Sequence, residues 1–145
     1  MAPASGVGEI ECGEAWSKLQ SDPSAILVDV RTTAEWTFVG VPDLGGVSNQ
    51  PIFLEWQSFP DGQVNAAFAQ TLTGLLDERG AQSETNILFL CRSGSRSRDA
   101  ARLMAAHGYT RCFNLSDGFE GPLNHERQRG RQIGWKAANL PWVQG

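Results

Sequence analysis

The stretch Asn86–Gly108, NILFLCRSGSRSRDAARLMAAHG, contains the pattern of a strand, a loop and a helix in direct succession. It opens with the apolar run Ile87–Leu90, which is typical of a strand buried on both faces of a parallel sheet. Its second half has apolar residues at helical spacing and ends at Gly108, a common helix stop. Strands alternate with helices elsewhere in the chain as well, which predicts an α/β protein with a parallel sheet covered on both faces.

The loop between this strand and helix is Cys91–Ser97, CRSGSRS. A loop at the carboxyl end of a parallel strand lies where open α/β sheets bind their ligands. Gly94 allows a tight turn in which backbone N–H groups converge, and such concavities bind anions. The following helix, expected to begin near Ser97, adds the positive end of its dipole, and Arg92 and Arg96 add full charges. These surroundings favour the thiolate of Cys91 and predict a nucleophile that can hold an anionic adduct.

Five further elements are expected before this stretch and one after it. The pattern predicts a short edge strand at 9–11, a helix at 13–20, a strand at 25–30, a strand at 51–56 and an amphipathic helix at 64–79, with loop at 40–50. A last buried strand is expected at 111–115. Its Cys112 should be inert, because burial in apolar surroundings disfavours the thiolate.

The spacing within the loop separates two classes of anion-binding enzyme. Tyrosine-type phosphatases use Cys-x5-Arg, whereas here the arginine comes one residue sooner, as Cys91-x4-Arg96. This six-residue loop resembles that of the rhodanese (sulfurtransferase) family. Three further segments support the resemblance and follow the family's order: Leu27–Arg31 (LVDVR) with Glu35-Trp36, Asn114–Phe119 (NLSDGF), and Gly134–Pro141 (GWKAANLP).

The resemblance implies a rhodanese-like three-layer sandwich over residues 1–145 as a single domain, with a central parallel five-stranded sheet in the order 1-5-4-2-3. It also implies a sulfurtransferase that moves sulfane sulfur from an anionic donor such as thiosulfate, through a Cys91 persulfide, to cyanide or a thiol. The expected anion-binding residues are Arg92, Ser93, Gly94, Ser95, Arg96 and Ser97. No metal or organic cofactor is expected.

Asp29 and Arg31 end the strand at 25–30 and should lie near the loop, since both follow the carboxyl end of a strand. They could be catalytic. The favoured interpretation is structural support, with Asp29 accepting backbone bonds from neighbouring loops and Arg31 paired with Glu35. Thr32 and Glu35 have the spacing of a capping box at the start of a helix.

The charge is distributed unevenly along the chain. The net charge is −4, yet residues 1–90 hold 3 of the 12 Lys/Arg and 12 of the 16 Asp/Glu, so positive charge concentrates in the part that carries the loop. This favours a small anionic substrate, with a protein sulfur acceptor also possible, and argues against nucleic acid as a partner. No apolar run has the length of a membrane span and no segment has the pattern of a signal peptide, so a cytoplasmic protein is expected. The cysteines do not form a disulfide framework or a metal-binding pattern.

Two other function classes stay open at this level. One is a phosphatase or arsenate reductase, which the short loop disfavours because it leaves less room for a tetrahedral oxyanion. The other is a rhodanese-like interaction module or persulfide carrier without turnover. Two segments could shape the pocket: 117–121 as a second wall, and the basic segment 124–134, which is either a solvated loop or a flap carrying Arg127, Arg129 and Arg131.

Overall fold

The computed structural model describes residues 7–47, 49–58, 62–123, 125–129 and 133–144. Within these ranges the main sheet has five parallel strands, in the order β1-β6-β5-β2-β4. The strands are β1 (Val7–Ile10), β2 (Ile26–Asp29), β4 (Ile52–Phe53), β5 (Ile87–Leu90) and β6 (Cys112–Leu115). Counted along the chain within this sheet, the order is 1-5-4-2-3, as the resemblance implied; the labels differ because β3 lies in a second sheet.

The strand β5 occupies the middle of the sheet, and all four of its residues are buried. It pairs with β2 on one side, from Ile26 against Ile87 to Asp29 against Leu90, and with β6 on the other. The expectation of a strand buried on both faces is therefore confirmed. Because β2 and β5 are parallel and in register, the segments that follow Asp29 and Leu90 leave the sheet side by side.

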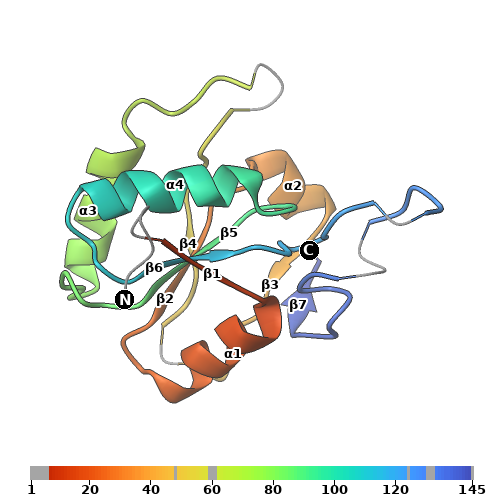
Figure 1. Ribbon diagram of the computed structural model, residues 1–145, viewed down its shortest axis with the longest axis horizontal. Helices are drawn as coiled ribbons and strands as arrows, with labels where there is room; N and C mark the ends of the chain where they lie inside the picture. The colour runs from red at the N-terminus through yellow and green to blue at the C-terminus, as the bar shows by residue number, and fades with distance from the viewer. Residues whose placement is uncertain (1–6, 48, 59–61, 124, 130–132, 145) are drawn as a thin grey trace.

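Helices cover both faces of the sheet, which confirms the three-layer α/β class (Figure 1). The helix α1 (Cys12–Ser21) packs on one face, where its buried residues share a cluster with Leu27, Leu88 and Leu90. The helices α3 (Phe68–Glu78) and α4 (Ser95–Ala106) pack on the other face, against the alternate residues of the same strands. Successive strand residues point to opposite faces, so each strand contributes to both cores.

Two elements are shorter than the sequence pattern predicts. The strand expected at 51–56 is reduced to Ile52–Phe53, and the helix expected at 64–79 begins only at Phe68. A local turn replaces the first part of that helix: the Asn65 side chain accepts a hydrogen bond from the Ala67 N–H, and the Asn65 carbonyl accepts one from Phe68. Asparagine competes for backbone groups in this way and disfavours helix interiors.

A second, two-stranded sheet was not expected from the sequence. It pairs β3 (Val41–Pro42) with β7 (Trp142–Val143) in antiparallel fashion, beside the short helix α2 (Thr33–Phe38) and the end of the described chain (Figure 1). Trp135, just before β7, is fully buried in the α1-side core. Among the described helices, none combines the length and the apolar character needed to cross a membrane.

Candidate active site

The helix α4 begins at Ser95, two residues earlier than predicted. Gly94 precedes it in the left-handed region, at φ +104°, and a Cβ there would lie 2.5 Å from the carbonyl oxygen of Ser116. Glycine meets both constraints at no steric cost, so the chain can turn into the helix immediately after the strand. The first N–H groups of a helix have no intrahelical partner. The amides of Ser95, Arg96 and Ser97, in the first turn of α4, therefore have no partner within the helix and are available to an anion at its N-terminus.

Cys91 is buried at the base of this loop, with 1% of its surface exposed. Its Sγ accepts a hydrogen bond from the Gly94 N–H at 3.1 Å and lies 3.2 Å from the hydroxyl oxygen of Ser97. The Gly94 N–H stabilises negative charge on the sulfur, and the N-terminus of α4 adds to its effect. The structure thus brings together the cysteine and the loop residues that the sequence indicated.

Ser97 is held by a residue that the sequence analysis did not single out, Asn114 of β6. The Ser97 Oγ lies 2.5 Å from Asn114 Oδ1, and Asn114 Nδ2 donates to Glu9 Oε1 at 2.8 Å and to the Gly94 carbonyl at 3.1 Å. An amide oxygen only accepts, so the Ser97 hydroxyl donates to Asn114 while its own oxygen is free to accept from a neutral thiol. Toward a thiolate the hydroxyl can turn and donate instead. A buried asparagine within the apolar strand β6 was the signal available in the sequence.

The turn at 117–121 lies behind the loop and supports its backbone. The Phe119 N–H donates to the Cys91 carbonyl at 2.8 Å, and the amides of Glu120 and Gly121 both donate to the Arg92 carbonyl. None of its residues belongs to the described lining of the cavity beside the loop, and that the turn forms a second wall of the pocket stays a prediction. Its contribution is to fix where the strand ends and the loop begins.

Asp29 and Arg31 form a fully buried ion pair beneath the site. Arg31 Nη2 donates to Asp29 Oδ2 at 2.7 Å and to the Gly40 carbonyl at 2.8 Å, and the guanidinium lies 4.2 Å from the centre of the Phe119 ring. The predicted pairing of Arg31 with Glu35 is wrong, because Arg31 turns inward to Asp29. Asp29 is satisfied mainly by Arg31, not by neighbouring loops. Both residues are inaccessible, which agrees with structural support.

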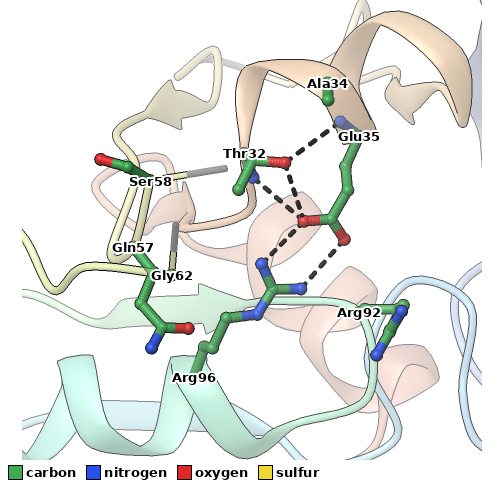
Figure 2. A pocket seen from close by; sticks show the side chains of 8 residues that line it. All are labelled: Thr32, Ala34, Glu35, Gln57, Ser58, Gly62, Arg92 and Arg96. Carbon is green, nitrogen blue, oxygen red and sulfur yellow. Dashed lines mark hydrogen bonds and ion pairs between the residues drawn. The ribbon is translucent and has the colours of Figure 1, made fainter. Parts of the chain in front are cut away.

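Glu35 instead pairs with Arg96 of the active loop. Its two carboxylate oxygens accept from Arg96 Nη1 at 2.7 Å and Nη2 at 2.9 Å (Figure 2). The capping box is confirmed, because Thr32 N–H and Oγ1 donate to Glu35 Oε1 and the Glu35 N–H donates back to Thr32 Oγ1. Burial alone would raise the pKa of Glu35, but the hydrogen bonds and charge of Arg96 outweigh it and lower that pKa. For Arg96, burial alone would lower the pKa of the guanidinium, but the hydrogen bond and charge of Glu35 outweigh burial and raise that pKa.

A cavity of about 360 Å³ opens beside this ion pair. Figure 2 shows Gln57, Ser58 and Gly62 on one side, with Arg96 and Arg92 contributed by the active loop. The described lining is completed by Thr32, Ala34 and Glu35. Cys91 is not among the described residues of this lining, whereas Arg92 and Arg96 of the same loop are.

The chain has two other cysteines, and the structure describes part of the basic segment 124–134. Cys12 and Cys112 are buried, and burial raises the pKa of both thiols, that of Cys112 to about 12, as expected for a buried cysteine in apolar surroundings. In the basic segment, Arg129 donates to the Gly121 carbonyl at 2.9 Å, while Arg131 lies outside the described residues. Over the described ranges, no group of three or more His, Cys, Asp and Glu side chains is placed to hold a metal ion.

Comparison with known proteins gives close matches over nearly the whole chain. The family model described as the STR4 middle domain matches residues 7–145. An uncharacterized protein of Rickettsia conorii is 40% identical over 129 residues, which is 89% of this chain and 91% of that protein. The crystal structure of Rv0390 from M. tuberculosis is 44% identical and has a TM-score of 0.82, covering 95% of this chain and 98% of that one.

More distant matches carry rhodanese or sulfurtransferase names. The Arabidopsis thaliana rhodanese-like domain-containing protein 4, chloroplastic, is 26% identical over 90% of this chain and 24% of its own length. The thiosulfate:glutathione sulfurtransferase of Saccharomyces cerevisiae is 30% identical over 61% of this chain and 58% of its own length. These similarities agree with the rhodanese-like fold that the strand order shows.

Proposed function

This chain belongs to the STR4 middle domain family, and from that premise we propose that it is a sulfurtransferase that carries sulfane sulfur as a persulfide on Cys91. The observation that carries the proposal is the environment of one atom. The Sγ of Cys91 accepts from the Gly94 N–H and lies within hydrogen-bonding distance of Ser97 Oγ, at the N-terminus of α4. Such a setting suits a nucleophilic sulfur whose adduct is negatively charged.

In the first half-reaction the Cys91 thiolate attacks the outer sulfur of an anionic donor such as thiosulfate. A bond forms between Sγ and the outer sulfur, and the sulfur–sulfur bond of the donor breaks. Its electron pair leaves with sulfite, and Cys91 holds a persulfide anion. Arg92 and Arg96 line the approach and would orient the sulfonate end of the donor, while the amides at the start of α4 would hold the charge of the persulfide.

In the second half-reaction a nucleophilic acceptor attacks the outer sulfur of the persulfide. The bond from that sulfur to Sγ breaks, and its electrons restore the Cys91 thiolate. If cyanide is the acceptor, it leaves as thiocyanate; if a thiolate is the acceptor, it leaves as a persulfide. The cavity of about 360 Å³ has room for an acceptor much larger than cyanide, which favours a thiol, either small or presented by a protein.

Intact-mass analysis after thiosulfate treatment tests the proposal, with sulfite measured in the same samples. We expect wild type and Cys112→Ala to gain one sulfur atom and release sulfite, and Cys91→Ser to do neither. Cys112→Ala is the matched control, because it removes another buried thiol far from the loop chemistry. If wild type gains no sulfur but hydrolyses phosphate esters, the loop is an oxyanion site of another class. Persulfide formation with no transfer to cyanide or thiols would identify a carrier that does not turn over.

A further inference from the structure

The two arginines that line the cavity are not equivalent. Arg92 is exposed, and no ion pair joins it to any described residue. Arg96 is mostly covered, with 20% of its side chain exposed, and both of its terminal nitrogens are bonded to the carboxylate of Glu35. Glu35 thus occupies the Nη1–Nη2 face of the guanidinium and neutralises its charge, and an arriving anion can use only the other N–H groups of Arg96 unless Glu35 is displaced.

Glu35 is fixed independently of Arg96. The N–H and hydroxyl of Thr32 both hold its Oε1, within the capping box at the start of α2. Its side chain is 18% exposed, so little solvent screens its charge. Glu35 is thus a fixed negative charge in the wall of the cavity. Among the described lining residues it reduces the charge of the cavity from two positive groups to a net of one.

We propose that Glu35 is a specificity-determining residue of this site, which limits the cavity to one free positive charge and so favours sulfur donors with a single negative charge over dianionic donors such as thiosulfate. The chemical class it favours comprises organic thiosulfonates and persulfides of thiols. The inference rests on the proposed function, since it concerns the donor for the same cysteine. Glu35 acts through Arg96 and through the charge of the cavity, and it has no part in the bond-making step.

The test compares Glu35→Gln with wild type on two donors, thiosulfate as the dianion and methanethiosulfonate as the monoanion. Glutamine suits the same position of a capping box, so the start of α2 is kept. Glu55→Gln is the matched control: Glu55 Oε2 accepts from the Thr33 N–H at 2.7 Å at the same helix end, and Glu55 is not among the described residues of the cavity. Both substitutions remove one negative charge from the same region.

We expect Glu35→Gln to raise kcat/KM for thiosulfate relative to methanethiosulfonate by about fivefold, the size expected for a half-buried ion pair. The change should come from a lower KM for thiosulfate. Glu55→Gln should keep the wild-type ratio to within about a factor of two. An unchanged ratio in Glu35→Gln, a fall in it, or an equal rise in both variants would overturn the inference.

A second measurement does not depend on turnover. Calorimetric titration with sulfate and with methanesulfonate, which are unreactive counterparts of the two donors, should show that Glu35→Gln strengthens the binding of sulfate more than that of methanesulfonate. If this holds while wild type transfers no sulfur, the charge selection stands and the proposed function fails. If wild type transfers sulfur but neither the kinetics nor the titrations separate the two anions, the role of Glu35 fails alone.

Discussion

The turn at 117–121 supports the active loop from behind, and adding one Cβ to this turn, at Gly118, tests that support. This residue has φ +71°, and a Cβ built on it would lie 2.3 Å from the carbonyl oxygen of Arg92 and 2.7 Å from the Cα of Ser93. Both contacts are with backbone, which cannot rotate away as a side chain can. Real Cβ atoms essentially never approach closer than 3.0 Å, so in Gly118→Ala the loop or the turn must move.

The matched control is Gly80→Ala at the end of α3. Gly80 has nearly the same backbone angle, φ +75°, but nothing lies within 4 Å of the added Cβ. Gly80→Ala should therefore show the cost of the left-handed conformation alone, about 1–2 kcal/mol in the free energy of unfolding. Gly118→Ala should lose a further ~1–3 kcal/mol, which is typical of overpacking in a rigid site.

The assays are urea unfolding for stability and mass spectrometry for the rate at which Cys91 gains sulfur. A displacement of several tenths of an ångström at Arg92 and Ser93 changes the loop that orients the donor. We expect the rate in Gly118→Ala to fall by about tenfold or more, and the rate in Gly80→Ala to match wild type. Equal losses of stability in the two variants, together with a wild-type rate in Gly118→Ala, would refute the idea that the turn holds the loop in place.

Three further predictions concern side chains at and below the site. Ser97→Ala removes the hydroxyl 3.2 Å from the sulfur, so persulfide formation at Cys91 should slow by about tenfold, and an unchanged rate would contradict this role. The same change leaves Asn114 Oδ1 without its buried donor and should lower the free energy of unfolding by about 1–3 kcal/mol. Arg31→Ala leaves the buried carboxylate of Asp29 without its partner and should lower the free energy of unfolding by about 3–5 kcal/mol in urea titrations, whereas a loss below about 1 kcal/mol would show that the pair is dispensable. Alkylation of the folded protein at pH 8 should leave Cys112 unmodified, because its thiol stays protonated until the pH approaches its pKa of about 12; peptide mapping that finds Cys112 labelled as fast as Cys91 would contradict this.

The local pattern around Cys91 was sufficient to predict the strand, turn and helix that carry the candidate site. A run of four apolar residues, a cysteine, a glycine and a helical repeat specify a buried strand, a turn and a helix whatever surrounds them. The structure has all three in that order, and Gly94 takes the positive φ that the turn needs. The helix begins two residues earlier than expected, because this glycine completes the turn by itself.

The partners of the charged side chains were not predictable in the same way. Arg31 and Glu35 are four residues apart and have opposite charge, so pairing them was the simplest local interpretation. The fold instead buries Arg31 against Asp29 and turns Glu35 toward Arg96, which is distant in the chain but adjacent in space. Similarly, no local pattern could indicate that Asn114 meets Ser97, because the contact arises only when β6 pairs beside β5.

The sequence by itself thus predicted the strand, turn and helix around Cys91 and indicated that cysteine and its loop as the candidate nucleophile and anion site, since these depend on periodicity and on residue types within a few positions of each other. Only the tertiary structure decided which charges face one another and how the loop is supported. Those contacts depend on the parallel register of β2, β5 and β6, which sets the segments after three separate strands side by side. This register brings Glu35, from the helix that follows β2, beside Arg96, and so leaves Arg92 as the arginine of the cavity whose charge is not offset by an ion pair with a described residue.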